Sequence, residues 1–499
     1  MDTLRKIILF AFVLLVAVAT SAQQRKPCLR NIPTDNAKTR VFLGYPVQDW
    51  NPQKVYRQAV VLISFADTDF SMDDSATYYN RLFNEKGYNE GLGQGCVADY
   101  FRDQSGGLFN LQFDIYGPVK VSINAKGSDN NYGDAATKEA LETLSTLTTQ
   151  DFSVYDWDGN GELEQMVFVV AGFTGNQVTG YIWPNTQYVA AKAPGDKIIR
   201  MNTISCELWE NNARCGIGTI CHEFAHCLGL PDIYPTQGST FSVVDEWDLM
   251  DGGNYTNKGW CPPNFSALEK MLLGWATPTE LTEPTTITGM KPVSEGGATY
   301  LIRNSGYTNE YYLLENRQQT KWDYGAPGGG LAIFHVNYDK DKWGSNEVNV
   351  SDSHPRYDLF HADSKDYKTW DPANNGEDKG KYTMDDWLRN RYLSTSPYPY
   401  TNPETQLIND VLNDESTPAS TVFNKNAEGA LLMSKAISNI RVADDGTISF
   451  DFMKTSTNLT PALSQGEGEG VWYDLQGRRL QGKPTRKGVY INNRKKVAL

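Results

Sequence analysis

Two hydrophobic patterns alternate through the first 276 residues. Residues 59–65 form a β-branched apolar run typical of a strand buried in a central sheet, and further strands are predicted at 108–116 and 165–171. Apolar residues at helical spacing predict helices at 78–83, 97–107, 138–147 and 262–275, with glycines at the ends of the second and the last. This mixture predicts an α+β domain over residues 58–276.

Beyond Ala276 the pattern changes to short strands separated by turns. The predicted strands are 285–288, 300–303, 310–316, 331–337, 436–442 and 447–452. They favour a β-sandwich-like domain over residues 277–453, in which residues 338–430 form a turn-rich, acidic elaboration. Residues 454–470 have the composition of a flexible linker, and residues 471–499 form a small, basic, hairpin-like tail.

The N-terminal residues 1–22 have the pattern of a signal peptide. Arg5 and Lys6 precede an apolar run from residue 7 to 19, and small residues end at Ala22. The apolar run is too short for a comfortable transmembrane helix, and no similar run follows, so we expect export to a secreted or cell-surface location in a bacterium. Residues 23–57 are polar and rich in proline, as in an N-terminal extension or propeptide.

The net charge of −14 argues against nucleic acid and anionic membranes as partners, because both require a basic face. The charge leaves proteins and peptides open as partners. The abundance of aromatic residues, with 12 Trp and 27 Tyr, suits a β-rich extracellular protein with a substrate cleft.

The strongest chemical signal is the stretch 221–232, CHEFAHCLGLPD. His222 and His226 are four residues apart, so on a helix both imidazoles project from one face and can bind a single Zn²⁺. Glu223 lies beside them, in position to take a proton from metal-bound water. Gly229 permits the chain to turn back and to bring Asp232 toward the metal, which leaves a fourth position for water.

This stretch resembles the immune inhibitor A family of secreted metallopeptidases, which belongs to the metzincins. Residues 99–107 (DYFRDQSGG), 273–275 (LGW), 311–318 (YYLLENRQ) and 328–337 (GGGLAIFHVN) share the resemblance. It implies a metzincin-like mixed sheet with an active-site helix and a substrate peptide added to the edge strand. The residue roles that it implies are zinc ligands at His222, His226 and Asp232, a general base at Glu223 and a methionine turn at Met250.

Several assignments at this site stay open. Asp245 and Glu246 are alternatives to Asp232 as the third ligand, and Tyr255 is a candidate donor to the oxyanion of the tetrahedral intermediate. We predict a secreted zinc endopeptidase that hydrolyses peptide bonds in proteins. The alternatives are a binding module without turnover and a structural zinc site, which Cys221 and Cys227 beside the motif keep open.

The seven cysteines suggest further chemistry. Five lie between residues 206 and 261, and in an exported protein this favours local disulfides, with Cys206 to Cys215 closing a short loop. The odd total leaves at least one thiol free or intermolecular. Cys28 precedes the catalytic region, and a thiolate from a prosegment can occupy the water position of a zinc enzyme and hold it latent.

Two further segments carry motifs outside the zinc site. Residues 156–164 place acidic and amide side chains at nearly alternate positions, which predicts a candidate Ca²⁺ loop made of Asp156, Asp158, Asn160, Glu162 and Glu164. The alternative is a turn built from Asp, Asn and Gly. The tail resembles the end of sorting domains in bacteria with type IX secretion, which would make that machinery a partner; the alternative is a small β appendage.

Overall fold

The structure is a computed structural model that describes residues 27–32, 50–237, 243–365 and 393–454, with three short strands further on. The chain divides into two compact units, Met1–Met453 and Lys454–Leu499. The second contains a three-stranded sheet of β18 (Trp472–Tyr473), β19 (Val489–Asn492) and β20 (Lys495–Ala498). The signal peptide, nearly all of the linker and most of the sorting motif lie outside the described residues and stay predictions.

A seven-stranded mixed sheet forms the base of the first unit. Its strand order is β1-β6-β7-β5-β2-β3, with β4 also paired to β7, and β6 is antiparallel to β7 while the other paired strands are parallel. The strands are β1 (Leu29–Arg30), β2 (Val55–Ser64), β3 (Asn110–Lys120), β4 (Glu162–Leu163), β5 (Met166–Phe173), β6 (Asn185–Ala193) and β7 (Lys197–Leu208). The sheet therefore carries the N-terminal segment on one edge, outside β6.

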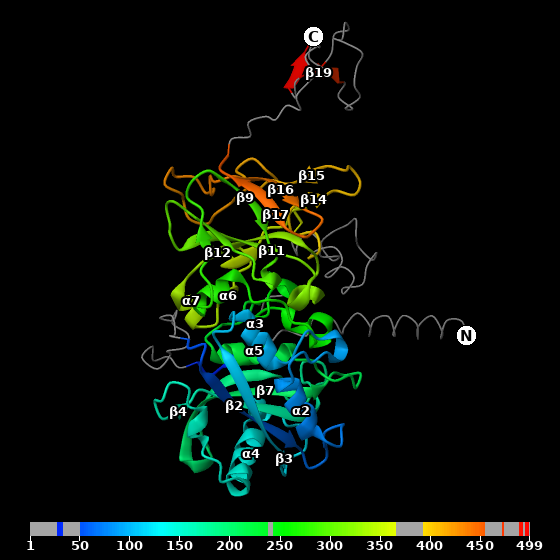
Figure 1. The fold of residues 1–499 in the computed structure, drawn as a ribbon, viewed down its shortest axis with the longest axis vertical. Helices are drawn as coiled ribbons and strands as arrows, with labels where there is room; N and C mark the ends of the chain where they lie inside the picture. The colour runs from blue at the N-terminus through cyan, green and yellow to red at the C-terminus, as the bar shows by residue number, and fades with distance from the viewer. Residues whose placement is uncertain are drawn as a thin grey trace, which may run out of the picture. The chain divides into compact units, whose positions relative to one another are not determined.

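Both faces of this sheet are buried, as the unbroken apolar run in β2 requires. Val60 and Leu62 pack into one core with α2 (Ser75–Asn84), α3 (Val97–Gln104) and α5 (Gly218–Cys227). Val61 and Ile63 pack into a second core with α4 (Asp134–Leu147). Helices thus cover both faces, and α5 lies on the face opposite α4 (Figure 1).

Three further sheets complete the first unit, and the smallest consists of β14 paired with β15. The five-stranded sheet has the order β13-β12-β11-β10-β8, and the three-stranded sheet has the order β16-β17-β9. Their bounds are β8 (Thr279–Glu280), β9 (Thr285–Met290), β10 (Tyr300–Arg303), β11 (Glu310–Arg317), β12 (Gly330–Asn337), β13 (Tyr357–Leu359), β16 (Ile437–Val442) and β17 (Ile448–Phe452). Shorter elements are α6 (Ala267–Leu272), α7 (Lys340–Gly344), β14 (Tyr400–Thr401) and β15 (Ile408–Asn409).

The five-stranded sheet is buried on both faces. Tyr312 and Leu314 share a core with Phe450 of the three-stranded sheet, so these two sheets pack face to face. Leu313 and Phe334 point the other way, into the core that contains α5. The helix consequently lies between two sheets (Figure 1), and the predicted domain boundary after Ala276 does not coincide with a gap in the packing.

The α+β class predicted from the sequence is confirmed by this arrangement. The predicted disulfide between Cys206 and Cys215 is not formed, because all seven cysteines are free thiols. The Cys206 side chain faces the second core, where its thiol donates a hydrogen bond to the carbonyl oxygen of Ile182 (3.2 Å). None of the helices among the described residues has the length and apolar character needed to cross a bilayer.

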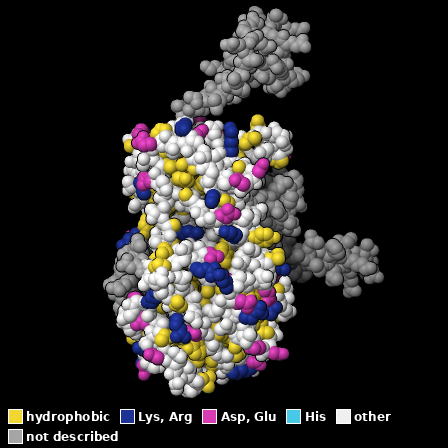
Figure 2. Space-filling model, viewed as in Figure 1, with side chains coloured by type: hydrophobic (Ala, Val, Ile, Leu, Met, Phe, Trp, Pro, Cys, Tyr) yellow, Lys and Arg dark blue, Asp and Glu magenta, His cyan; other side chains and the backbone are white. Residues whose placement is uncertain are grey.

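Figure 2 shows one face of the molecule. On its described residues, Lys and Arg side chains form small groups with Asp and Glu side chains among them. Groups of mixed sign cancel one another's field at a distance. This face therefore offers mixed charge to a partner.

Candidate metal centre

Helix α5 carries both histidines of the predicted zinc motif, and all ten of its residues are buried. A Cβ on Gly218, its first residue, would lie 2.1 Å from the carbonyl oxygen of Asn254. Only glycine allows this close approach to the segment η6 (Gly253–Gly259). The start of the helix is therefore fixed by packing against its neighbour.

The helix ends as the sequence predicts. Gly229 has a φ of 101°, a backbone conformation that residues with a Cβ rarely adopt. Its N–H donates to the carbonyl oxygen of His226 (3.0 Å), and the N–H of Leu230 donates to that of Ala225 (3.3 Å). The chain turns back at this point and brings Asp232 over the two histidines.

Three buried atoms converge where the motif predicts a metal. The Nε2 atoms of His222 and His226 each lie 3.3 Å from Oδ1 of Asp232. These three atoms are buried and have no hydrogen-bond partner. Buried polar atoms without partners are costly, and a divalent cation would satisfy all three at once. The donor set therefore fits Zn²⁺.

The carboxylate that joins the histidines is Asp232. Among the described residues, His222, His226 and Asp232 form a group whose ligand atoms lie within 4.8 Å of one another, and no such group contains Asp245 or Glu246. Cys221 and Cys227 are likewise absent from such groups. Cys221 is instead buried in the core around the helix, and Cys227 packs beside Met201.

The second nitrogen of each histidine is held by a backbone carbonyl. Nδ1 of His222 lies 2.8 Å from the oxygen of Leu249, and Nδ1 of His226 lies 2.7 Å from the oxygen of Leu230. Donation from Nδ1–H to these oxygens leaves each Nε2 with a lone pair for a metal. Met250, the predicted methionine of the turn, is fully buried, and its carbonyl accepts from the N–H of Ile233 (2.8 Å). The turn thus contacts both the helix and the loop that carries Asp232.

Asn346 holds Asp232 by two hydrogen bonds. Its Nδ2 donates to Oδ2 of Asp232 (2.7 Å), and its Oδ1 accepts from the backbone N–H of Asp232 (2.6 Å). Burial acts to raise the pKa of Asp232, but the electrostatic effect of His226 and His222, whose Nε2 atoms lie 3.3 Å away, outweighs it and lowers that pKa in the metal-free protein. The sequence did not single out Asn346, which lies just beyond α7, far along the chain from the motif.

Glu223 is buried beside the two histidines. The hydroxyl of Thr186 lies 3.0 Å from its Oε2 and 2.7 Å from its carbonyl oxygen. Burial raises the pKa of Glu223 to about 7 in the metal-free protein. Thr186 belongs to β6, so the strand next to the sheet edge contacts the predicted base directly.

The N-terminal segment reaches into the same site. The N–H of Cys28 lies 3.2 Å from Oδ2 of Asp232 and 3.0 Å from the hydroxyl of Tyr234. The Cys28 thiol, a ring nitrogen of His222 and a carboxylate oxygen of Glu223 all lie within 4.8 Å of one another. This arrangement places the thiol beside both a predicted ligand and the predicted base.

Two tyrosines differ in their relation to the centre. The ring of Tyr234 stacks on that of His222, with centroids 6.4 Å apart and an interplanar angle of 18°. The hydroxyl of Tyr255, the predicted oxyanion donor, accepts a hydrogen bond from Asn176 (3.0 Å), and its ring packs against Trp209. Tyr234 therefore contacts a residue of the metal group, and the sequence analysis missed it.

The candidate Ca²⁺ loop folds on its own backbone. Asp156 accepts from the N–H groups of Gly159 (2.7 Å) and Gly161 (2.7 Å), and Glu164 accepts from the N–H of Trp157 (3.0 Å). The remaining predicted ligands are Asp158 and Asn160, which are hydrogen bonded to each other, and Glu162, which forms an ion pair with Arg200. Carboxylates at Asp156, Asp158 and Glu164 lie close together, but these bonds stabilise the loop as a turn. Calcium consequently has no support here.

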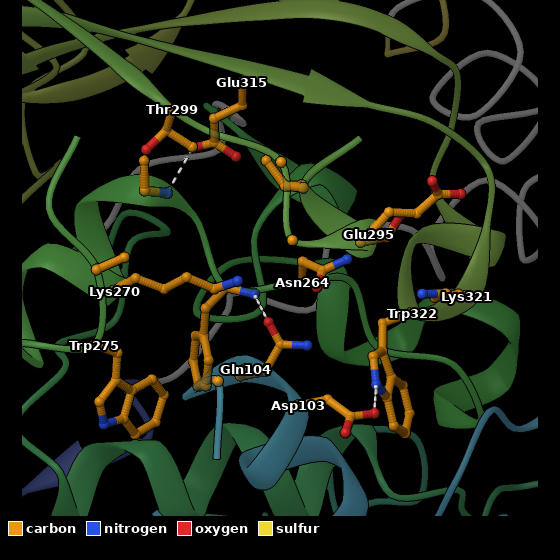
Figure 3. A pocket seen from close by; sticks show the side chains of 18 of the residues that line it. Asp103, Gln104, Asn264, Lys270, Trp275, Glu295, Thr299, Glu315, Lys321 and Trp322 are labelled. Carbon is orange, nitrogen blue, oxygen red and sulfur yellow. Dashed lines mark hydrogen bonds between the residues drawn. The ribbon is translucent and has the colours of Figure 1, made fainter. Parts of the chain in front are cut away.

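A pocket of about 690 Å³ lies elsewhere in the first unit, between α3, α6 and β11 (Figure 3). Asp103 accepts a hydrogen bond from the indole of Trp322 (3.0 Å), and Glu315 accepts from the N–H of Ala267 (2.6 Å). Burial lowers the pKa of Lys270 in its wall. None of the predicted site residues lines this pocket, so the metal group remains the candidate site.

Comparison with known proteins identifies relatives of this region. Residues 63–275 match the family model for the immune inhibitor A peptidase M6 catalytic domain. The chain is 23% identical to the pre-pro-metalloprotease PrtV of Vibrio cholerae serotype O1 (strain M66-2) over 273 residues, which are 47% of this chain and 29% of that protein. It is 26% identical to Immune inhibitor A of Bacillus thuringiensis subsp. alesti over 302 residues, which are 48% of this chain and 41% of that protein. The chain thus spans less than half the length of these relatives.

Proposed function

Since residues 63–275 of this chain belong to the immune inhibitor A peptidase family, we propose that the chain is a zinc-dependent endopeptidase that cleaves proteins. The observation that carries the proposal is the convergence of three unpaired buried atoms, Nε2 of His222, Nε2 of His226 and Oδ1 of Asp232. Three protein donors with room for a fourth are the usual count of a catalytic zinc site.

Each residue of the site would have a separate role in peptide-bond hydrolysis. When bound there, Zn²⁺ would act as a Lewis acid that polarises the scissile carbonyl and makes a bound water more acidic. Glu223 would accept a proton from the attacking water at a carboxylate oxygen and return it to the leaving amine nitrogen. The hydroxyl of Thr186 would hold that carboxylate in place. Asn346 would fix Asp232 in its ligating orientation.

The position of β6 supports an extended substrate. β6 becomes the edge of the sheet once the two-residue strand β1 is removed, and Thr186 of β6 touches Glu223. A peptide that adds to this edge would pass beside the predicted base. We also propose export to a secreted or cell-surface location, on the pattern of residues 1–22.

The test combines metal content with cleavage. Purified chain and its Cys28→Ala variant are measured for bound zinc by mass spectrometry and for casein cleavage, before and after chelation. Glu223→Ala in the Cys28→Ala background should keep one zinc and lose at least about 100-fold in cleavage rate. Asp232→Ala should lose zinc, while Glu246→Ala, which alters one of the alternative ligands, should retain both properties. Unchanged cleavage in the Glu223→Ala protein would refute the assignment of the base.

One observation favours a second candidate. The Cys28 thiol beside His222 gives the site a fourth protein donor, and sites closed by four protein ligands are usually structural. A structural site would need Cys28 to hold its metal. A catalytic site would keep its metal after Cys28 is replaced.

A further inference from the structure

We propose that residues 27–32 hold this peptidase inactive, with Cys28 closing the metal site as a removable fourth ligand and β1 covering the edge where the substrate would bind. The proposal rests on the proposed function and names the regulation of that site. It is carried by contacts that join one short segment to a metal ligand, to the predicted base and to the sheet edge.

The Cys28 thiol lies beside one of the predicted metal ligands. Cys28 is 7% exposed and packs with Trp183 and Tyr234, which enclose it. Its sulfur lies within 4.8 Å of a ring nitrogen of His222, whose Nε2 is buried and unpaired. Thiolate is among the preferred ligands of Zn²⁺, so the sulfur is available as a fourth ligand beside the three predicted donors.

The thiol also lies against the predicted base. Ligation would break the S–H bond of Cys28 and form a bond between sulfur and the metal, with the proton released to solvent. The sulfur lies within 4.8 Å of a carboxylate oxygen of Glu223 as well as of a ring nitrogen of His222. In this position the thiol occupies space beside Glu223 that an attacking water would need.

The backbone of the segment occupies the substrate edge. The N–H of Thr186 donates to the carbonyl oxygen of Cys28 (3.0 Å), and β1 pairs in parallel with β6, with Leu29 opposite Thr186 and Arg30 opposite Gln187. These are the hydrogen-bonding groups that a substrate strand would use on β6. Segment and substrate therefore compete for one edge.

The segment also engages two side chains that a substrate would meet. The N–H groups of Cys28 and Leu29 both point at Oδ2 of Asp232 (3.2 and 3.4 Å), and the N–H of Cys28 lies 3.0 Å from the hydroxyl of Tyr234. When the segment leaves, Asp232 keeps its hydrogen bonds to Asn346. The Tyr234 hydroxyl then loses its contact with Cys28, and it faces the position that the segment has vacated.

The test reads the metal's ligands directly in the zinc-loaded full chain. X-ray absorption at the zinc edge should show one sulfur ligand at about 2.3 Å in the unaltered chain. Cys28→Ala should lose that sulfur, keep one zinc and cleave casein at least tenfold faster. Cys215→Ser, which alters a partly buried thiol outside the site, should keep the sulfur ligand and the unaltered rate.

The outcomes separate this proposal from the proposed function. A zinc edge without sulfur in the unaltered chain overturns the latency, and so does an unaltered chain that cleaves as fast as Cys28→Ala. Neither result contradicts the peptidase assignment if Glu223→Ala in the Cys28→Ala background still cleaves casein much more slowly than Cys28→Ala alone. A Cys28→Ala protein that folds by circular dichroism but loses zinc indicates a structural four-ligand site and overturns both. A Cys28→Ala protein that keeps zinc but cleaves nothing also overturns both.

Discussion

Replacement of Asn346 by aspartate should weaken zinc binding without breaking the fold. Asn346 has a φ of 59°, a left-handed conformation that Asp tolerates nearly as well as Asn. One carboxylate oxygen can still accept from the N–H of Asp232, but the Nδ2 donor to Oδ2 of Asp232, at 2.7 Å, is replaced by an oxygen. The variant therefore changes one contact of one predicted ligand.

The lost contact is a hydrogen bond to a charged group, which contributes about 1.5–3 kcal/mol. Since about 1.4 kcal/mol is a factor of ten in affinity, zinc affinity should fall roughly 10- to 100-fold, and repulsion between the two carboxylates adds to the loss. Competition with a fluorescent chelator measures the zinc dissociation constant. Asn316→Asp is the matched control, because the buried Asn316 donates to the carbonyls of Met290 and Gly446; it should lower thermal stability and leave zinc affinity unchanged. Native affinity in Asn346→Asp would refute the role given to Asn346.

Three further results are expected. Thr186→Val removes the hydroxyl 3.0 Å from Glu223 Oε2 and should slow casein cleavage about tenfold in the Cys28→Ala background with zinc content unchanged; an equal loss of zinc would instead indicate a folding defect. Burial raises the pKa of Glu310, but hydrogen bonds from His335 and two backbone N–H groups bring it to about 2, below its ordinary 4.5. A lowered pKa in the folded state stabilises the fold above pH 4.5, and this contribution is lost as the pH falls toward 2. The free energy of unfolding, measured with urea, should therefore decrease by about 2 kcal/mol over this pH range, and Glu310→Gln should lack this decrease. Gly229→Ala forces a Cβ onto a φ of 101° and should cost about 1–2 kcal/mol, read as a lower melting temperature; an unchanged melting temperature would contradict the backbone argument.

Local patterns in the sequence predicted the elements with a clear apolar period. The apolar runs of β2 and β12 and the spacing of His222, His226 and Gly229 are visible within a few residues, and the structure has the strands, the helix and the turn at those places. The period of a helix or strand is a local property, so sequence alone suffices to find it.

The strands nearest the site lacked such a pattern. β7 buries Asn202, Thr203, Ser205 and Glu207, and a strand with polar residues on its buried positions does not show the apolar signal of a core strand. Their burial depends on partners elsewhere, as when the Thr203 hydroxyl donates to Gln165 (2.8 Å). Neither β6 nor β7 was therefore predicted.

The contacts that complete the centre join distant parts of the chain. Asp232 and Asn346 are 114 residues apart, and Cys28 and Asp232 are 204 residues apart. No spacing rule connects such pairs, because the fold brings them together. The sequence raised the role of Cys28 only from its place ahead of the catalytic region, and it gave no signal for Asn346 or Tyr234.

The position of α5 between two sheets bears on how this protein can be shortened or recombined. A protein truncated after Trp275 would still contain the segment that matches the catalytic-domain model of the family. It would lack Leu313 and Phe334, which pack into the core around α5. The same truncation would delete Asn346. The matched segment and the β-sheets that follow it thus share one hydrophobic core. A truncated protein without those sheets would expose an apolar surface and would tend to self-associate.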